Sequence, residues 1–307
     1  MKRRDFLKTT GSSALAAMIM SRVSASKASA LRTPIGLQLF TVMFALEHDF
    51  EQTMKSVAEI GYREVETIGT FGRDPAMIRD LCQKYGLVSP SQHLAPEGLY
   101  DVFKGLFAKK ISEPDLVKHY LHVFRPDNIT AVIDEGIKNA KLMGQTFIVW
   151  PILFEEQLAP SATLDQFIKA FNIAGDMCAR EGLIFTYHNH DREFKKAEGV
   201  VPYDVILQNT NPKTVKMELD FYWATKGGAS PAHYFKTYPD RYKMGHLKDM
   251  DTHGNITNVG EGTIDFPELI KLAKEAGIKH YYVENDNPSA NPVNDARISY
   301  NYLKKVM

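Results

Sequence analysis

From Pro34 onward, stretches with apolar residues three and four positions apart alternate with short runs rich in apolar and β-branched residues. The first pattern predicts amphipathic helices, and the second predicts buried strands. A glycine separates several helices from the next strand, as a short left-handed helix-to-strand turn requires; these are Gly61, Gly86, Gly144, Gly182 and Gly277. The strands are expected at 35–42, 63–67, 87–94, 146–151, 183–190, 214–221, 242–249 and 280–286.

Strands that alternate regularly with helices favour a single closed (β/α)8 TIM barrel. A doubly wound open sheet is the alternative, but it normally carries a glycine-rich phosphate loop after its first strand. Phe40-Thr41-Val42-Met43 is not such a loop. The segment 96–125 is too long for a plain loop, so we expect an inserted helical segment after the third strand. One barrel domain is expected over 31–307.

The first 30 residues differ from the rest of the chain. RRDFLK (3–8) is a twin-arginine start, GSSALAAMIM (11–20) is moderately apolar, and Ala28-Ser29-Ala30 offers a small-residue cleavage site. We interpret 1–30 as a cleaved export signal. This interpretation predicts a periplasmic or secreted protein that meets the twin-arginine translocase during export.

The composition narrows the function classes. The 307 residues carry a formal net charge of zero and are 44% hydrophobic, which is typical of a globular protein. Net neutrality gives no attraction to nucleic acid or to an anionic membrane. No apolar stretch beyond the N-terminus is long enough to span a bilayer, so no stable membrane association is expected. Cys82 and Cys178 are interpreted as small core residues, and a homo-oligomer is left open.

Four polar residues end four successive predicted strands: His188, Asp220, His246 and Glu284. They lie roughly 30 residues apart, the length of one strand-plus-helix unit. The C-terminal ends of parallel strands in a closed barrel meet at one mouth. Two imidazoles and two carboxylates at one point are typical of a divalent-metal site. Buried carboxylates also need a cation.

The mixed nitrogen and oxygen donors favour a transition ion over Ca²⁺. Mn²⁺ is the expected cofactor, with Zn²⁺, Co²⁺, Fe²⁺ and Ni²⁺ as alternatives. Such an ion polarises a carbonyl beside a C–H bond and stabilises the resulting enediolate. A carboxylate or imidazole then removes the proton. The expected substrate is a small carbohydrate.

Five motifs resemble the xylose-isomerase-like TIM barrel family: YHNHDREF (187–194), ELDFYW (218–223), GHLKDMD (245–251), VGEGTIDF (259–266) and YYVENDNP (281–288). The family includes sugar isomerases, ketose 3-epimerases and inosose dehydratases, and the N-terminus resembles its exported twin-arginine subset. The resemblance implies an isomerase or epimerase acting on a free sugar, keto-sugar or keto-glycoside by proton abstraction next to a carbonyl.

The chain departs from the epimerase pattern at the fifth strand. Many epimerases of the family carry Glu-Asn-His there, whereas this chain has His188-Asn189-His190. The ligand position is thus an imidazole, as in the dehydratase-like branch, and the resemblance assigns catalytic roles to Glu284 and His188. A metal-dependent lyase, dehydratase or keto-glycoside-cleaving enzyme is therefore the alternative, through the same enediolate.

Further site residues are expected around these four. Lys248 is a catalytic candidate that would donate to a substrate oxygen, unless it forms a salt bridge with Asp220 or Asp249. Glu261 is expected to support a metal-binding histidine. A metal-dependent endonuclease and a non-enzymatic sugar-binding protein are further alternatives, which the neutral charge and the metal site respectively disfavour. The candidate substrate-binding residues are His93, His190, Glu193, Glu66, Trp150 and Trp223.

Overall fold

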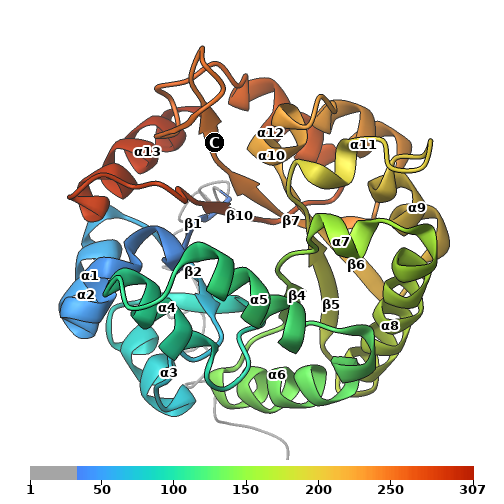
Figure 1. The fold of residues 1–307 in the computed structure, drawn as a ribbon. Helices are drawn as coiled ribbons and strands as arrows, with labels where there is room; N and C mark the ends of the chain where they lie inside the picture. Colours follow the sequence, from blue (N-terminus) through green and yellow to red (C-terminus); the bar gives the residue numbers. More distant parts are fainter. Residues whose placement is uncertain (1–32) are drawn as a thin grey trace, which may run out of the picture. The chain divides into compact units, whose positions relative to one another are not determined.

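The computed structural model describes residues 33–307, in which eight parallel strands close into a barrel (Figure 1). The order around the barrel is β1-β10-β7-β6-β5-β4-β3-β2, so strands that follow one another in the chain are neighbours. The predicted (β/α)8 barrel is confirmed. The barrel strands are β1 (Ile35–Gln38), β2 (Glu64–Ile68), β3 (Val88–His93), β4 (Phe147–Trp150), β5 (Ile184–His188), β6 (Val215–Asp220), β7 (Tyr242–Leu247) and β10 (His280–Val283).

Helices surround the barrel, and a two-stranded antiparallel sheet of β8 (Asp249–Met250) and β9 (Ile256–Thr257) follows β7. The helices are α1 (Met43–His48), α2 (Phe50–Ile60), α3 (Pro75–Lys84), α4 (Leu99–Phe107), α5 (Glu113–Val123), α6 (Ile129–Met143), α7 (Glu155–Leu158), α8 (Ser161–Arg180), α9 (Pro202–Asn209), α10 (Phe221–Lys226), α11 (Pro231–Thr237), α12 (Phe266–Glu275) and α13 (Pro292–Val306). Short 3-10 helices are η1 (Leu39–Val42), η2 (Pro126–Asn128) and η3 (Arg192–Phe194).

Glycines end the helices as the sequence predicts. Gly144 follows α6 with φ of 73°, in the left-handed region that side chains with a Cβ rarely adopt. Its N–H donates to the Ala140 carbonyl, which would otherwise lack a helical partner. The other four predicted glycines also have positive φ. These turns return the chain to the start of the next strand, so the barrel strands run in one direction.

Seven of the eight barrel strands end before their predicted C-terminal limit, whereas β2 ends one residue beyond it, at Ile68. The sequence predicts a strand over 35–42, but β1 ends at Gln38 and the 3-10 helix η1 follows. The Gln38 side chain accepts a hydrogen bond from the Phe40 N–H at 3.2 Å, which starts that turn. Likewise β10 ends at Val283 rather than at 286. After β1 the apolar run Leu39–Val42 continues beyond the ladder because this part of the barrel mouth is itself buried.

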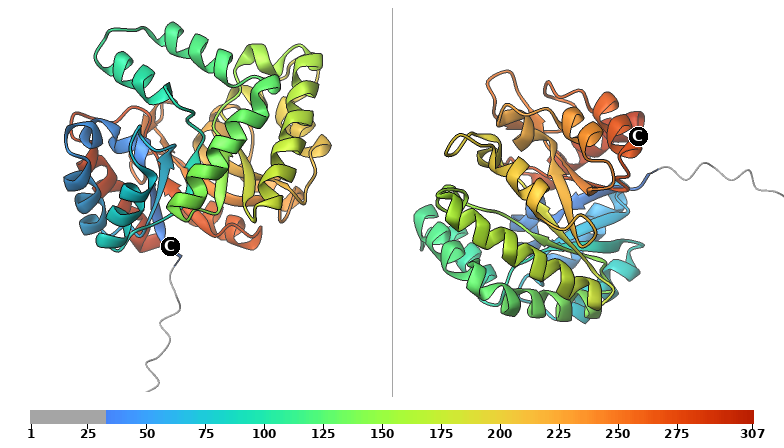
Figure 2. Two further views of the ribbon diagram at one scale, coloured as in Figure 1. Left: turned by 90° about the horizontal axis from the view of Figure 1, so that it is seen from below. Right: turned by 90° about the vertical axis from the view of Figure 1, so that its right-hand side faces the viewer.

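The predicted helical insertion after the third strand is confirmed as α4 and α5. Figure 2 shows these two helices projecting from one end of the barrel. Ser112 and Asp115 form a reciprocal capping box at the start of α5. Phe103 of α4 and Tyr120 of α5 pack edge to face, with ring centroids 6.1 Å apart. The pair forms part of a roof above the strand ends.

Side chains alternate between the barrel interior and the helical layer. On β4, Phe147 and Val149 belong to a small apolar cluster with Met244 and Tyr282. Ile148 and Trp150 join the larger core shared with the helices. Interior side chains nearer the C-terminal strand ends are polar, which is unusual for a barrel interior that bulky apolar residues normally fill. The polar layer therefore needs a functional explanation.

Cys82 in α3 and Cys178 in α8 are buried free thiols, which confirms their interpretation as core residues. Within residues 33–307, no helix combines the length and apolar character that crossing a bilayer requires. The expected export signal at 1–30 lies outside the described residues.

Gly175 provides a test of packing in the helical layer. A Cβ at this position in α8 would lie 2.8 Å from the Thr214 carbonyl oxygen just before β6, and backbone cannot easily move away. We expect Gly175→Ala to lower the free energy of unfolding by about 1–3 kcal/mol through overpacking. Ile173→Ala, at a largely exposed position on the same helix, should change it by less than about 0.5 kcal/mol. Urea unfolding measures both; equal effects would contradict the close approach of α8 to the barrel.

Candidate metal and sugar site

Four predicted residues converge at the barrel mouth, and we call them the upper tier: His188, Asp220, His246 and Glu284. One donor atom from each lies within 4.8 Å of the others. Their strands β5, β6, β7 and β10 are successive neighbours in the barrel. All four are buried, and Glu284, at 6% exposure, lines a cavity at the mouth. The donor types and spacing fit a divalent transition ion.

Local structure holds these side chains in place. Asp220 is the N-cap of α10: its Oδ1 accepts the Trp223 N–H at 2.7 Å. This leaves Oδ2 facing the Lys248 ammonium, 3.2 Å away. The Asn189 side chain accepts the Asp220 N–H at 3.1 Å. One strand end thus orients a carboxylate toward the centre of the mouth.

Lys248 is fully buried among three carboxylates. Its Nζ lies 2.7 Å from Asp286, 2.8 Å from Glu284 and 3.2 Å from Asp220. Burial opposes the charged form, but these carboxylates raise the pKa of Lys248 well above its ordinary value. The expected alternative of a salt bridge to Asp220 is therefore present, while Lys248 also lines the cavity.

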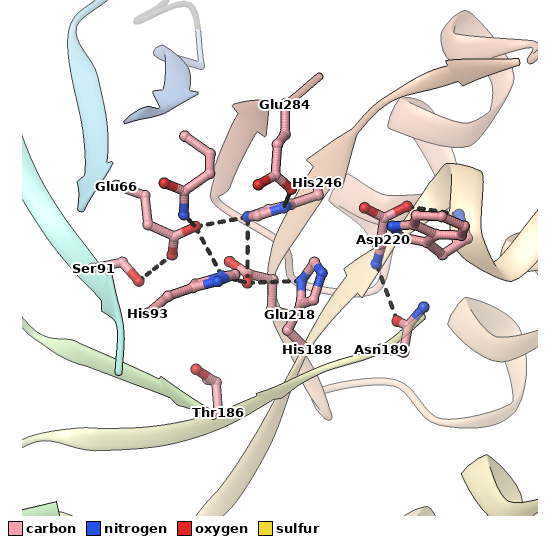
Figure 3. A network of polar contacts seen from close by, with 12 residues as sticks. Glu66, Ser91, His93, Thr186, His188, Asn189, Glu218, Asp220, His246 and Glu284 are labelled. Carbon is pink, nitrogen blue, oxygen red and sulfur yellow. Dashed lines mark hydrogen bonds and ion pairs between the residues drawn. The ribbon is translucent and has the colours of Figure 1, made fainter. Parts of the chain in front are cut away.

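A second polar layer lies beneath the upper tier (Figure 3), and we call it the lower tier: Glu66, His93 and Glu218. Glu218 Oε2 is 2.8 Å from His93 Nε2 and 3.1 Å from His188 Nδ1. Glu66 Oε2 is 2.6 Å from His246 Nε2 and 3.2 Å from His93 Nε2. Both carboxylates have no solvent exposure. The lower tier therefore contacts the upper tier through the two upper-tier histidines, His188 and His246.

Glu66 is the most completely bonded of these groups. Its Oε2 also accepts the Gln38 side-chain N–H at 2.7 Å, and its Oε1 accepts the Ser91 hydroxyl. Burial raises the pKa of Glu66, but the nearby His93 and His246 outweigh this and hold the pKa below its ordinary value. Glu66 thus carries a buried negative charge within a fixed hydrogen-bond network.

At His246 and Glu284 the charges nearby outweigh burial: Glu218, Glu284 and Glu66 raise the pKa of His246 well above its ordinary value, and Lys248 and His246 lower that of Glu284. At the other two upper-tier groups burial sets the direction of the pKa shift. It raises the pKa of Asp220 to about 6, and the Lys248 ammonium opposes that rise. Burial and the neighbouring His246 lower the pKa of His188 well below its ordinary value. A neutral imidazole and an ionised carboxylate at neutral pH are the forms that bind metal ions.

Other predicted residues lie in different places. His93 and His190 line the cavity, and His190 Nδ1 is buried with no hydrogen-bond partner among the described residues. Trp223 lies beside His190, with ring centroids 5.3 Å apart. The Trp223 indole is not among the cavity-lining residues, so it supports His190 and does not form the wall.

Three further expected substrate contacts, besides Trp223, lie outside the cavity. Trp150 points into the helical layer, packs on Phe124 and Phe171, and donates to the Ile152 carbonyl, because strand alternation turns it away from the interior. Glu66 lies in the lower tier. Glu193 is sealed behind the wall, where its Oε1 accepts the Tyr187 hydroxyl at 2.5 Å and the His190 N–H at 3.1 Å.

The expected role of Glu261 is wrong. Glu261 is exposed and accepts an N–H from Asn258 at 3.0 Å. Asp249 instead organises this loop: its carboxylate accepts the N–H groups of Gly260, Gly262 and Ile264 at 2.9, 3.0 and 3.1 Å. A Cβ on Gly262 would lie 2.3 Å from Asp249 Oδ1, so this glycine permits the contact. The GHLKDMD (245–251) and VGEGTIDF (259–266) motifs are therefore joined by the hydrogen bonds of Asp249.

Sequence reasoning missed Glu218 and the aromatic roof. Glu218 precedes Asp220 by two residues, so it shares the interior face of β6, and strand alternation was the available signal. The roof joins Phe40, Phe103, Tyr120 and Phe154, with ring centroids 5.9–6.1 Å apart. It comes from η1, α4, α5 and the start of α7, so no local motif marks it.

The family model described as xylose isomerase-like TIM barrel matches residues 54–306. An inosose dehydratase from Geobacillus kaustophilus (strain HTA426) is 22% identical over 284 residues, covering 84% of this chain and 87% of that protein. The structure of a sugar phosphate isomerase/epimerase from Parabacteroides distasonis ATCC 8503 has a TM-score of 0.71 at 25% identity, covering 88% of this chain and 97% of that one.

A D-allulose 3-epimerase from Methylomonas sp. has a TM-score of 0.61 at 15% identity, covering 90% of this chain and 98% of that one. At that identity the likeness shows a shared fold alone. The matches extend over almost the full length of these relatives, so they concern the whole barrel.

The pH dependence of stability tests whether Glu193, buried behind the cavity wall, is protonated in the folded protein. Burial raises its pKa from 4.5 to about 7, so the folded state holds this proton more tightly than the unfolded state. The stability that protonated Glu193 contributes is present below about pH 4.5 and is lost as pH rises through about 7. The difference between a pKa of 4.5 and one of about 7 corresponds to about 3 kcal/mol of folding stability.

We therefore expect Glu193→Gln, which keeps an acceptor for Tyr187 and His190, to gain stability relative to the wild type between pH 5 and pH 8. The gain should approach about 3 kcal/mol. Denaturant unfolding across this range measures it. A stability difference that does not vary with pH would show that the Glu193 carboxyl is not protonated in the folded wall.

Proposed function

We propose that this chain, which belongs to the xylose isomerase-like TIM barrel family, is a divalent-metal-dependent sugar isomerase or epimerase. Its substrate would be a free sugar, keto-sugar or keto-glycoside, deprotonated beside its carbonyl. The observation that carries the proposal is the convergence of four metal-donor side chains beside a cavity at the barrel mouth. Mn²⁺ remains the expected ion.

The upper tier would hold the ion, which when bound supplies Lewis-acid polarisation of the carbonyl and stabilisation of the enediolate. Glu284 lies at the cavity and is the proposed proton acceptor, because its carboxylate is both ionised and accessible to substrate. Lys248 donates to a substrate oxygen as negative charge develops there. His190 offers its unpartnered Nδ1 to a substrate hydroxyl or to the proton on the opposite face.

The cavity favours an unphosphorylated substrate. Among its lining residues, Lys248 is the one lysine or arginine, and three carboxylates already surround its ammonium. A phosphate group is usually bound by arginine, lysine or free backbone N–H groups. The opposite wall is apolar and aromatic, as pockets for sugar C–H faces are.

A dehydratase or other lyase is the second candidate. Proton removal next to a carbonyl also prepares the loss of a leaving group from the neighbouring carbon, so both reactions share the first step. The inosose dehydratases among the relatives and the imidazole at His188 favour this alternative. His190 or Lys248 would then protonate the leaving group.

Proton exchange tests the shared first step. The Mn²⁺-loaded protein should catalyse deuterium incorporation from D₂O next to the carbonyl of a keto-sugar, and Glu284→Gln should slow exchange by about 10³-fold with the fold intact. Glu261→Gln, an exposed loop carboxylate, is the matched control and should keep the wild-type rate. NMR follows the exchange and identifies isomerised or eliminated products. Unchanged exchange in Glu284→Gln would remove this residue from the mechanism, and a wild-type protein without bound metal or exchange would favour sugar binding alone.

We also propose export through the twin-arginine pathway, which the RRDFLK start supports. Replacing both arginines, Arg3→Lys with Arg4→Lys, should leave the full-length precursor in the cytoplasm and reduce the periplasmic protein by at least about tenfold. Cell fractionation and mass measurement of the N-terminus test this. Undiminished cleavage and export of the double variant would contradict a twin-arginine route.

A further inference from the structure

Two overlapping groups of side chains in this barrel have the composition of a metal site. One is the upper tier, and the other joins His93 and Glu218 to the same two histidines, His188 and His246. A neutral imidazole has one N–H and one lone pair. The shared histidines can therefore ligate an ion in one group while donating a hydrogen bond in the other.

The carboxylates of the two groups differ in their access to the cavity. Glu284 lines the cavity, whereas Glu66 and Glu218 do not and have no solvent exposure. Both of these lower carboxylates have histidine partners at direct hydrogen-bond distances: 3.1 Å from Glu218 Oε2 to His188 Nδ1, and 2.6 Å from Glu66 Oε2 to His246 Nε2. An ion entering from the cavity, which His93 and the shared His188 also line, therefore meets the Glu284 carboxylate before either lower one.

His246 shows why the lower tier matters. Its Nδ1 lies 2.7 Å from Glu284 and its Nε2 lies 2.6 Å from Glu66, so both ring nitrogens face a carboxylate. Glu66 is fixed by Gln38 and Ser91, while Glu284 is at the cavity and also contacts Lys248. When an ion displaces one proton from His246, the Nδ1 proton beside Glu284 is the one that can leave.

We propose that Glu66 and Glu218 are positioning residues for the metal site, a proposal that rests on the proposed metal-dependent function. Glu66 holds the Nε2–H of His246 and Glu218 holds the Nδ1–H of His188. These bonds leave Nδ1 of His246 and Nε2 of His188 for one shared divalent ion. The lower tier is thus the orienting shell of a single ion and not a second metal site.

His93 joins the two positioning carboxylates. Its Nε2 lies 2.8 Å from Glu218 and 3.2 Å from Glu66, so one N–H can be shared between them. Its ring stacks on that of His246 at 5.2 Å between centroids, with the planes 2° apart. This packing restricts rotation of the His246 ring and keeps its nitrogens facing Glu66 and Glu284.

Metal titration tests the proposal. Wild-type protein should bind one Mn²⁺ per chain. Glu66→Gln and Glu218→Gln, which keep an acceptor but lose the charge, should weaken binding by about tenfold; Glu66→Leu and Glu218→Leu should weaken it by up to about 100-fold. Unfolding of the metal-free variants shows whether each is folded. Folded Leu variants with wild-type affinity would overturn the proposal, as would two ions per chain. If the Leu variants do not fold, wild-type affinity in the Gln variants would overturn it.

Glu64 offers a matched control. It lies on β2 two residues before Glu66 and forms the same kind of buried bond, from Oε2 to His280 Nδ1 at 2.9 Å, away from the two tiers. Glu64→Gln should change stability but leave Mn²⁺ affinity unchanged. A loss of affinity equal to that of Glu66→Gln would show a general effect of destabilising the barrel.

The position of the proton on each histidine ring gives a further readout, because a merely structural role of Glu66 and Glu218 would not determine which ring nitrogen is protonated. In Zn²⁺-loaded protein, ¹H–¹⁵N spectra of the histidine rings should show the proton on Nδ1 of His188 and on Nε2 of His246. The opposite tautomers would overturn the assignment. If wild-type protein binds no ion, the proposed function fails; if it binds one ion but the variants bind equally, only the positioning role fails.

Discussion

The structure depends on compensating the negative charge that the barrel buries at one end. The carboxylates of Glu66, Glu218, Asp220 and Glu284 lie within the two polar tiers, and an isolated buried carboxylate is strongly unfavourable. Lys248 and the imidazoles supply positive charge and hydrogen bonds to these carboxylates. A protein selected only for stability would fill this space with apolar residues, as barrels commonly do. The tiers therefore indicate chemistry.

Strand alternation creates these tiers with little additional structure. Residues two apart on a strand face the same side, so Glu218 lies below Asp220 on β6, and Glu66 lies between Glu64 and Ile68 on β2. Because neighbouring strands are parallel, each such position meets an equivalent one on the next strand, as Asp220 meets His246. A ring of strands thus turns a spacing of two residues into a stack of interacting layers.

Most of the fold follows from periodicity, since the alternation of helical and strand patterns locates every barrel strand. The strand ends do not follow as well, because the apolar pattern can persist where the hydrogen-bonded ladder stops, as it does after β1. The upper tier could be predicted because its four residues end successive strands. Trp150 could not be placed in this way: an indole at a strand end has the same local sequence whether it faces the cavity or the helices.

The aromatic roof and the role of Glu66 were beyond sequence reasoning for a different reason. Phe103 and Tyr120 lie on an insertion whose position over the mouth depends on tertiary packing. Glu66 is a polar residue near the predicted end of its strand but lies in the middle of β2, and only its contacts with Gln38, Ser91 and His246 reveal it as a support. Local pattern identifies which residues are polar and interior, while partners determine what each does.

The ammonium of Lys248 has one more consequence. It lies within 3.2 Å of three acidic side chains, where it acts as a built-in counterion for the unloaded protein. The barrel can therefore close without a metal ion to neutralise these carboxylates. Under the proposed function, binding of the ion would be a late, reversible step, and lack of the ion would stop turnover without unfolding the protein.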